Sequence, residues 1–250
     1  MKAIILAAAL KTDYFQFHRN IPQALLNLEG RPLLDHWVGK LNRFPVINEI
    51  IVVSDQKFFP NFREWQKHSS YKKPLRIIHN GCDEPGDRPG GLGDLELALR
   101  PSIGTAESFL VFCGDSYFDF CIGHFLLPCL GHPDYTFIGL SGSEDQASVS
   151  QCAVAEMDPN GKIVRFEEKH ADPASAHVSV GVYYLPAKGR LQLREYLIEA
   201  RRQRPEQIAD FMTWLAGRDS VYGVVLDGEW FDVGFRTAHK DVTRQVSHED

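Results

Sequence analysis

A carboxylate follows directly on a strongly apolar stretch of the chain. Residues Phe109–Cys113 predict a buried strand, and Gly114 and Asp115 come immediately after it. An aspartate at the carboxyl end of a central strand, behind a glycine that lets a ligand come close, suits Mg²⁺, which prefers carboxylate and phosphate oxygens. The alternative is that such a carboxylate caps the next helix, and Asp119 fits that role better. We therefore expect Asp115 to contact a metal or a nucleotide and Asp119 to be structural.

The most glycine-rich segment of the chain, residues 80–93, runs into a predicted helix over Asp94–Leu99. Glycine-rich backbone that opens a helix presents N–H groups and the positive end of the helix dipole, so it is typical of a phosphate or nucleobase site. A plain connecting loop is the alternative. This segment is the second place where a phosphorylated ligand is expected.

The N-terminus predicts a buried parallel strand over Lys2–Ala8, because its apolar residues are continuous rather than alternating. A long polar loop follows and leads to Pro22. In an open α/β sheet the ligand binds outside the carboxyl ends of the strands. The loop is therefore a third candidate for chemistry.

The segments that follow alternate between strand and helix patterns. The first strand, a helix opened by Pro32 and a strand over Asn48–Val53 form a βαβ unit. Asp55 follows the second strand as a ribose-binding acid would, but no G-x-G-x-x-G follows the first, which argues against dinucleotide binding. Further segments are predicted as helices over Phe58–Gln66, Leu191–Ala200 and Pro205–Leu215, and as strands over Ala24–Leu28, Leu75–His79, Tyr135–Ser141, Gln151–Met157, Ile163–Lys169, Ser179–Tyr183 and Val221–Leu226.

Composition narrows the class of protein. With 250 residues and 44% hydrophobic content, the chain can bury one large core, and we expect a single domain over residues 1–250. A net charge of −6 argues against nucleic acid as a partner. We expect no membrane partner and no signal peptide, because no apolar run approaches about 20 residues and the N-terminus lacks a basic segment. Five cysteines, an odd number, favour thiols and a cytoplasmic location.

Two Cys-x2-His pairs raise the alternative of a zinc site. Cys121, His124, Cys129 and His132 extend over about 17 Å on a straight helix, so they would converge on one ion only if Pro128 folded the segment back. Buried thiols beside surface histidines are the simpler interpretation.

The first 26 residues resemble the opening of the sugar-1-phosphate nucleotidyltransferases, the NDP-sugar pyrophosphorylases of the glucose-1-phosphate thymidylyltransferase type. The signature of that family is L-A-A-G-x-G-T-R, followed some residues later by P-K. Its glycines let backbone N–H groups close on the triphosphate, its arginine neutralises the departing pyrophosphate and its lysine holds phosphate oxygens. The resemblance implies that the nucleotide contacts Leu6, Ala8, Ala9, Lys11, Thr12 and Gln23.

This chain departs from the signature where charge and space matter. Ala9 and Lys11 replace the two glycines, Asp13 replaces the arginine and Gln23 replaces the lysine. Arginine to aspartate exchanges a bidentate phosphate donor for a carboxylate beside a highly anionic ligand. Lys11 or Arg19 could supply the missing charge from another direction.

Further motifs extend the resemblance over roughly residues 1–242. Residues 80–95 resemble the family's N-D-G…D-R-L-G-x-I-G-D-I stretch, and residues 114–115, 165–170 and 230–234 resemble its G-D, F-x-E-K-P and W-x-D-x-G motifs. The resemblance implies a second metal carboxylate in Asp232, which acts with Asp115 and Lys169 in catalysis. It also implies nucleotide contacts at Arg88, Gly93, Asp94 and Gly114, and contacts to the sugar and its phosphate at Glu168, Lys169 and Gly181.

The resemblance implies a doubly wound α/β domain with a mixed, mostly parallel sheet, the Rossmann-like nucleotidyltransferase fold of the glycosyltransferase-A type. It implies Mg²⁺-assisted transfer of a nucleotidyl group from a nucleoside triphosphate to a sugar-1-phosphate or similar molecule, with release of pyrophosphate. The degenerate first loop favours the alternative of an inactive homologue that binds nucleotide or nucleotide sugar as a regulatory or partner subunit. The oligomeric state, including a homo-oligomer, stays open.

Overall fold

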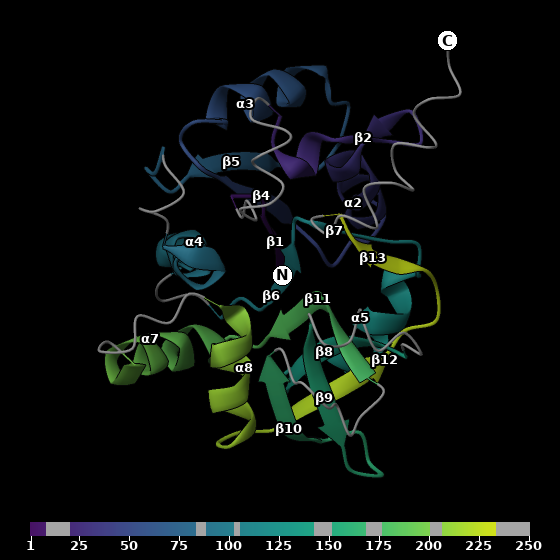
Figure 1. Ribbon diagram of the computed structural model, residues 1–250, viewed down its shortest axis with the longest axis vertical. Helices are drawn as coiled ribbons and strands as arrows, with labels where there is room; N and C mark the ends of the chain where they lie inside the picture. Colours follow the sequence, from purple (N-terminus) through teal and green to yellow (C-terminus); the bar gives the residue numbers. More distant parts are fainter. Residues whose placement is uncertain are drawn as a thin grey trace.

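The computed structural model describes residues 1–8, 21–83, 89–102, 106–142, 152–168, 177–200 and 207–233, and its largest element is a mixed sheet. The strands run in the order β10-β9-β11-β6-β1-β4-β5, and β8 joins this sheet by pairing with β11 and β12 (Figure 1). Its parallel part is made of β5 (Leu75–His79), β4 (Glu49–Ser54), β1 (Lys2–Leu6) and β6 (Phe109–Cys113).

The parallel strands are apolar without alternation because both faces of the sheet are covered. In β1, Ala3 and Ile5 point into one hydrophobic core, and Ile4 and Leu6 point into another on the opposite face. Successive side chains of a strand point to opposite faces, so two covered faces require a continuous apolar run. The structure confirms the predicted buried parallel strand, which ends at Leu6 and lies in the middle of the sheet.

The other part of the sheet is built around β11 (His177–Leu185), which pairs antiparallel with β6, β8 and β9. Its register with β8 shifts between Ser179 and Tyr183, and Gly181 lies in this interval with a φ of +73°. The remaining strands of this part are β8 (Thr136–Gly142), β9 (Ala153–Met157), β10 (Ile163–Glu168) and β12 (Val221–Val225).

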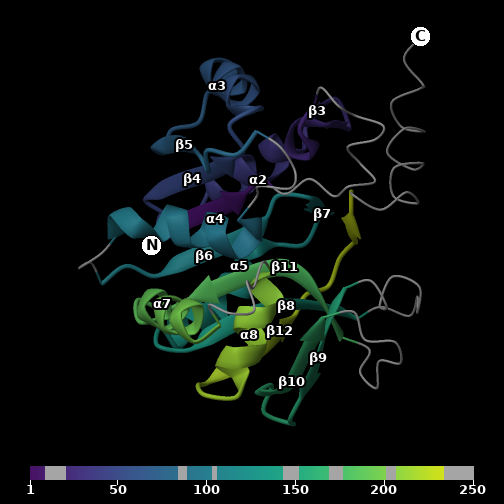
Figure 2. The ribbon, with the colours of Figure 1, turned by 60° about the vertical axis from the view of Figure 1, so that its left-hand side comes forward.

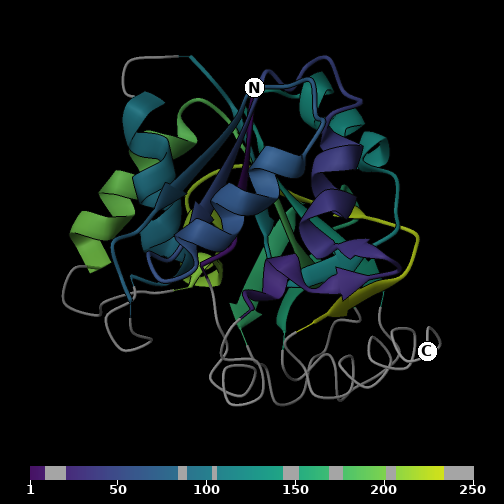
Figure 3. The same ribbon diagram turned by 90° about the horizontal axis from the view of Figure 1, so that it is seen from above.

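Helices cover both faces, so the expected doubly wound α/β fold is confirmed. Side chains of α2 (Leu33–Leu41), α3 (Phe59–His68) and α5 (Ile122–Gly131) enter one core. Side chains of α4 (Gly90–Leu99), α7 (Gly189–Glu199) and α8 (Ile208–Ala216) enter the other. Figure 2 shows α4, α7 and α8 together, and Figure 3 shows α4 and α7 across the sheet from α2 and α5.

Short elements complete the described part of the chain. They are the 3₁₀ helices η1 (Gln23–Leu25) and η3 (Arg100–Ser102), the hairpin of β2 (Asn27–Leu28) and β3 (Arg31–Pro32), and the ribbon of β7 (Ser116–Phe118) and β13 (Trp230–Asp232). The strand predicted over Ala24–Leu28 is therefore a 3₁₀ turn followed by a two-residue strand. The predicted helix at Asp94 begins earlier, at Gly90.

Pro128 does not fold its segment back. It lies inside α5, and the helix continues to Gly131. Cys129 is buried in the core, whereas Cys121 precedes the helix and is exposed. Among the residues described, no three histidine, cysteine, aspartate or glutamate side chains gather where they could hold a metal ion. His124, His132 and Cys129 fit the interpretation of surface histidines beside a buried thiol, whereas the exposed Cys121 does not.

Within the described ranges, none of the helices has the length and the apolar character that crossing a bilayer requires.

Candidate active site

The candidate site begins where β1 and β6 end side by side. Leu6 is the register partner of Cys113, and the Gly114 N–H donates a 2.9 Å hydrogen bond to the Leu6 carbonyl. A Cβ on residue 114 would lie 2.7 Å from that oxygen and 3.0 Å from Cα of Ala7. Glycine is needed here because the main chain of β1 leaves no room for a side chain. Asp115 thus leaves the sheet at its carboxyl edge, as predicted.

The β7–β13 ribbon brings the two predicted metal carboxylates onto neighbouring backbones. Asp232 pairs with Ser116, and the Val233 N–H donates a 2.7 Å hydrogen bond to the carbonyl of Asp115. These segments are far apart in the sequence, so no local pattern could pair them. For Asp232 the structure describes the backbone, and this backbone stands directly beside that of Asp115.

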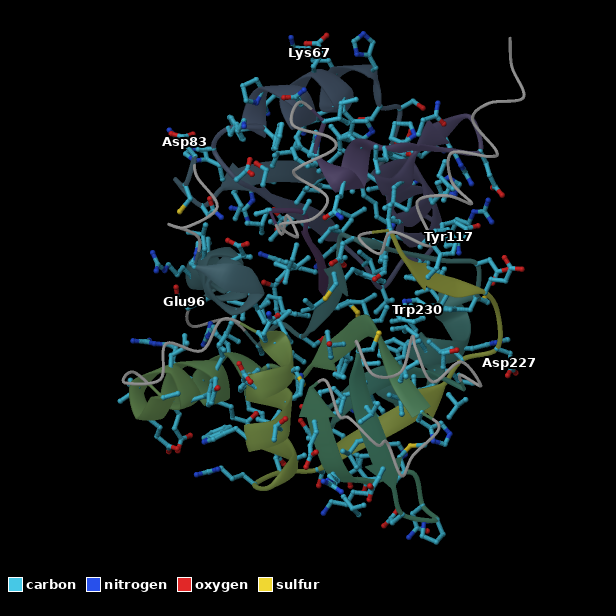
Figure 4. All side chains as sticks on the ribbon, viewed as in Figure 1. Lys67, Asp83, Glu96, Tyr117, Asp227 and Trp230 are labelled. Atoms are coloured by element: carbon cyan, nitrogen blue, oxygen red, sulfur yellow. The ribbon has the colours of Figure 1, made fainter. Side chains whose placement is uncertain are left out.

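Aromatic side chains fix the ribbon on both sides. The Tyr117 ring lies edge-on to His36 of α2 at 5.3 Å and against Phe231 at 5.1 Å between ring centroids. Trp230 packs against the small cluster formed by Val154 and Val178. Figure 4 labels Tyr117 and Trp230 on this ribbon. The ribbon is therefore held both by helix α2 and by the antiparallel part of the sheet.

Asp119 holds the turn that leads into β13, and the prediction that it caps a helix is wrong. Its Oδ1 accepts a 2.7 Å hydrogen bond from the Glu229 N–H, and its own N–H donates to the Glu229 carbonyl at 3.1 Å. Helix α5 begins at Ile122 without a side-chain cap. Gly228 has a φ of +145°, and a Cβ there would overlap the Asp119 carboxylate. Asp119 therefore pairs with a residue distant in the sequence, Glu229, and not with the N-terminus of α5.

Lys40 joins helix α2 to the same ribbon. Its Nζ donates to the carbonyls of Phe118 at 2.6 Å and Phe120 at 3.4 Å, and it lies 4.8 Å from the centre of the Phe118 ring. Burial lowers the pKa of Lys40, and the negative charge of Asp119 opposes that shift. Nothing in its local sequence distinguishes Lys40 from a solvent-exposed helix lysine.

Gly181 lies at the same edge of the sheet, against the last residue of β6. A Cβ on residue 181 would lie 2.9 Å from Cβ of Cys113, and its φ of +73° is one that other residues rarely adopt. Its N–H donates to Oγ of Ser179 at 3.4 Å. The structure thus places Gly181 next to Cys113, whose side chain leaves no room for a Cβ at position 181.

The first turn of α4 is held by packing and by a buried carboxylate. A Cβ on Gly93 would overlap Cβ of Pro89. Asp94 is buried, and its Oδ1 accepts a 2.9 Å hydrogen bond from Nδ2 of Asn80, which follows β5. The Asn80 N–H in turn donates to the Ser54 carbonyl at 3.0 Å. Asp94 therefore positions the start of α4 over the carboxyl ends of β4 and β5.

Gln23 is the most unusual polar side chain near the first loop. It is 2% exposed, and among the described residues neither its Nε2 nor its Oε1 has a hydrogen-bond partner. Leaving a buried amide unsatisfied costs about 1–3 kcal/mol for each group. A polar ligand atom would remove that cost.

Comparisons with known proteins identify the family of the chain. The family model described as Nucleotidyl transferase matches residues 2–249. The chain belongs to the nucleotidyl transferase family. It is 23% identical over 236 residues to the bifunctional protein GlmU of Methanocaldococcus jannaschii, covering 94% of this chain and 51% of that protein. It is 25% identical over 251 residues to the glucose-1-phosphate thymidylyltransferase of Streptomyces griseus, covering 98% and 66%.

Solved structures share the nucleotidyl transferase fold. A Bacillus anthracis structure assigned as a glucose-1-phosphate thymidylyltransferase, in complex with sucrose, has a TM-score of 0.82 at 20% identity and covers 100% of this chain and 96% of its own. A UDP-glucose pyrophosphorylase complexed with UDP-glucose has a TM-score of 0.77 at 17% identity, with coverage of 100% and 99%. The nucleotidyl transferase chain spans about half the length, 51%, of the first archaeal relatives it matches.

The described part of the nucleotidyl transferase chain brings together some of the predicted site residues. Leu6 and Ala8 are buried, so the side chain of neither is exposed to a ligand. Asp115, Gly114 and Gly181 gather at one edge, and the backbone of Asp232 joins them. For Glu168 the backbone is described, and the following predicted residues lie outside the described residues: Ala9, Lys11, Thr12, Arg88 and Lys169.

Proposed function

We propose that this nucleotidyl transferase moves a nucleotidyl group from a nucleoside triphosphate to a sugar-1-phosphate or a similar phosphorylated molecule and releases pyrophosphate. The β7–β13 pairing carries the proposal, because it puts Asp232 beside Asp115 at the carboxyl edge of the sheet. The family match and relatives that are sugar-1-phosphate nucleotidyltransferases by name support the same reaction.

Mg²⁺ is the cofactor that these residues fit. Asp115 and Asp232 stand on adjacent backbones, and carboxylates supply the hard oxygens that Mg²⁺ binds together with phosphate oxygens of a substrate. Asp115 and Asp232 would hold the ion, which supplies neutralisation of the charge that develops on the phosphates.

The reaction requires positioning rather than a protein nucleophile. An oxygen of the sugar phosphate attacks the α-phosphorus, a new P–O bond forms, and the bond from the α-phosphorus to the bridging oxygen breaks as pyrophosphate leaves. The chain's own contribution is to hold the two phosphorylated substrates in line. Gly114 and Gly181 let β1, β6 and β11 approach closely at the edge where Asp115 stands, and the buried amide of Gln23 can bond to a phosphate oxygen in place of the family's lysine.

The remaining site assignments are parts of the same proposal. We assign nucleotide contacts to Ala9, Lys11, Thr12 and Arg88 and contacts to the sugar and its phosphate to Glu168 and Lys169, on the resemblance of their motifs. Asp94 acts through the position of α4, since its hydrogen bond goes to Asn80.

We also propose that the protein works in a reducing compartment such as the cytoplasm. All five cysteines lie in the described part of the chain, and none forms a disulfide. Proteins that keep several unlinked cysteines are typical of reducing compartments.

Pyrophosphate release tests the proposed reaction. The assay combines Mg²⁺, the common nucleoside triphosphates and dTTP, and a panel of sugar-1-phosphates. It compares wild type with Asp115→Asn and with Asp134→Asn, a matched control on an exposed aspartate. We expect release by wild type and by Asp134→Asn, and a loss of about 10²-fold or more in Asp115→Asn.

Two results would contradict the proposal. Equal release by wild type and Asp115→Asn would remove Asp115 from the reaction. No release from any substrate pair, together with a Mg²⁺-dependent rise of Tm on nucleotide addition, would identify an inactive homologue that still binds nucleotide.

A further inference from the structure

A pocket outside the candidate active site lies between helices α4 and α7. Its volume is about 230 Å³. Figure 1 shows these helices as neighbours on one side of the sheet, and Figure 4 labels Glu96 on the part of α4 near α7. The lining residues are Glu96, Leu99 and Arg100 from α4 and η3, and Arg190, Leu193 and Arg194 from α7.

Arg190 is the buried member of this set. It is 8% exposed, and its Nη1 donates a hydrogen bond to the carbonyl of Ser102. Its Nε is buried and has no hydrogen-bond partner in the ranges that the structure describes. Within the described part of the chain, the guanidinium of Arg190 forms no ion pair. A buried cation without a counter-ion is strongly unfavourable, so this position calls for an anion.

The other charged residues of the pocket leave an excess of positive charge. Glu96 already pairs with Arg100, with 2.6 Å between Oε2 and Nη2. Arg194 brings a third guanidinium on the exposed side of α7. The pocket therefore has three guanidinium groups and one carboxylate, and that carboxylate, Glu96, already pairs with Arg100.

The placement of the arginines on α7 points the same way. Arg190 is the second residue of the helix and lies in its first turn, whereas Arg194 is the sixth of its eleven residues. Positive side chains near a helix N-terminus are disfavoured by the helix dipole. An anion beside Arg190 would offset that repulsion and would accept bidentate hydrogen bonds from guanidinium groups. The buried Leu99 and Leu193 lower the local dielectric and strengthen such contacts.

We propose that this pocket is a second ligand site, which binds the phosphate group of a compact anionic small molecule between α4 and α7. Its volume is below the range of about 300–1,000 Å³ typical of pockets for drug-sized ligands, which favours a small phosphorylated compound over a nucleotide. The pocket lies at the C-terminal end of α4, about 10 Å along the helix axis from the first turn at Gly90–Gly93. Its ligand therefore does not share the phosphate contacts of the candidate active site.

The test uses inorganic phosphate as the probe. Phosphate is titrated without Mg²⁺ and without nucleotide, sodium chloride keeps the ionic strength constant, and the Tm is recorded. The variants are Arg190→Gln, Arg194→Gln and the control Arg63→Gln, which removes the same charge from an exposed position on α3. Arg194→Gln keeps the test valid if Arg190→Gln fails to fold after losing its bond to Ser102.

We expect the Tm of wild type and Arg63→Gln to rise by roughly 3–6 °C at phosphate concentrations about tenfold above the dissociation constant. Arg194→Gln should bind phosphate roughly tenfold or more weakly, because it loses a charge-assisted contact.

Either of two results would overturn the site. One is a wild-type Tm that phosphate raises no more than chloride does. The other is an equal phosphate response in wild type and Arg194→Gln, which would place the anion elsewhere. Because the titration needs no turnover, its outcome is separate from that of the pyrophosphate assay.

Discussion

The glycine at the end of β6 gives a sharp test of how the candidate site is built. Gly114→Ala adds one methyl group, whose carbon would lie 2.7 Å from the Leu6 carbonyl oxygen and 3.0 Å from Cα of Ala7. Both neighbours are main-chain atoms in the centre of the sheet, so neither can rotate away. The carbonyl of Leu6 also accepts the Gly114 hydrogen bond at 2.9 Å, and separation of the strands would stretch that bond.

The magnitude follows from these contacts. Ordinary contact begins at 3.4 Å, so β1 and the residue 114 segment must separate by about 0.7 Å. Overpacking of this kind costs about 1–3 kcal/mol, and weakening a buried hydrogen bond adds about 1 kcal/mol. For a chain of this length we expect the Tm to fall by roughly 5–15 °C. Asp115 moves with residue 114, and a shift approaching 1 Å at a reacting group lowers kcat by about 10²-fold.

Thermal unfolding and pyrophosphate release measure the two effects. Gly39→Ala is the matched control, because Gly39 lies inside α2 and a Cβ there has no neighbour within 4 Å. This variant should gain about 0.5–1 kcal/mol from helix propensity and keep wild-type activity. A Gly114→Ala variant with the wild-type Tm and kcat would refute the close approach of β1 and β6 as the reason for glycine here.

Other parts of the structure give independent predictions. Asp119→Ala should lower the free energy of unfolding by about 1 kcal/mol and should also lower pyrophosphate release, because it removes the acceptor for the Glu229 N–H. Asp119→Asn retains Oδ1 and should be less affected. Equal losses in both variants would contradict the hydrogen-bond role. Burial lowers the pKa of His36 in the folded protein below its usual value of 6.5. The unfolded chain therefore binds a proton at His36 at a higher pH than the folded protein does, and the stability of wild type should decrease as the pH falls through 6.5. In a series of Tm measurements at decreasing pH, His36→Gln should show a smaller decline than wild type. Identical slopes of Tm against pH in the two proteins would contradict this role of His36. Burial raises the pKa of the Cys129 thiol, so a thiol reagent should modify the exposed Cys121 and should leave Cys129 unmodified until the protein unfolds. Similar rates of modification of the two cysteines in the folded protein would contradict this.

Local sequence was sufficient for the elements that carry the site. The apolar runs at Lys2–Leu6 and Phe109–Cys113 are strands in the structure, and the carboxylate at the end of the second stands at the predicted edge. These predictions were right because a strand that is buried on both faces has a continuous run of apolar residues, which can be recognised in a few consecutive positions. The family's motifs likewise lie in short segments, and the fold that they implied is confirmed.

Where local signals competed with distant partners, the sequence was a poorer guide. Asp119 resembles a helix cap in its local context, yet its hydrogen bonds go to Glu229. The segment after Asp115 has no recognisable strand pattern of its own, because β7 is three residues long and exists through its pairing with β13. The residues around Lys40 in the sequence do not indicate its hydrogen bonds to the carbonyls of Phe118 and Phe120.

The sequence by itself determined the class of fold, the order of its strands and helices along the chain, and the position of Asp115 at the end of a central strand. Only the tertiary structure decided that Asp232 lies beside it, that Gly114 is required by the main chain of β1, and that Gln23 and Arg190 are buried with unsatisfied nitrogen atoms. The physical reason is the range of the interactions. Strand and helix patterns arise from neighbouring residues, whereas burial and pairing depend on segments that meet only when the chain has folded.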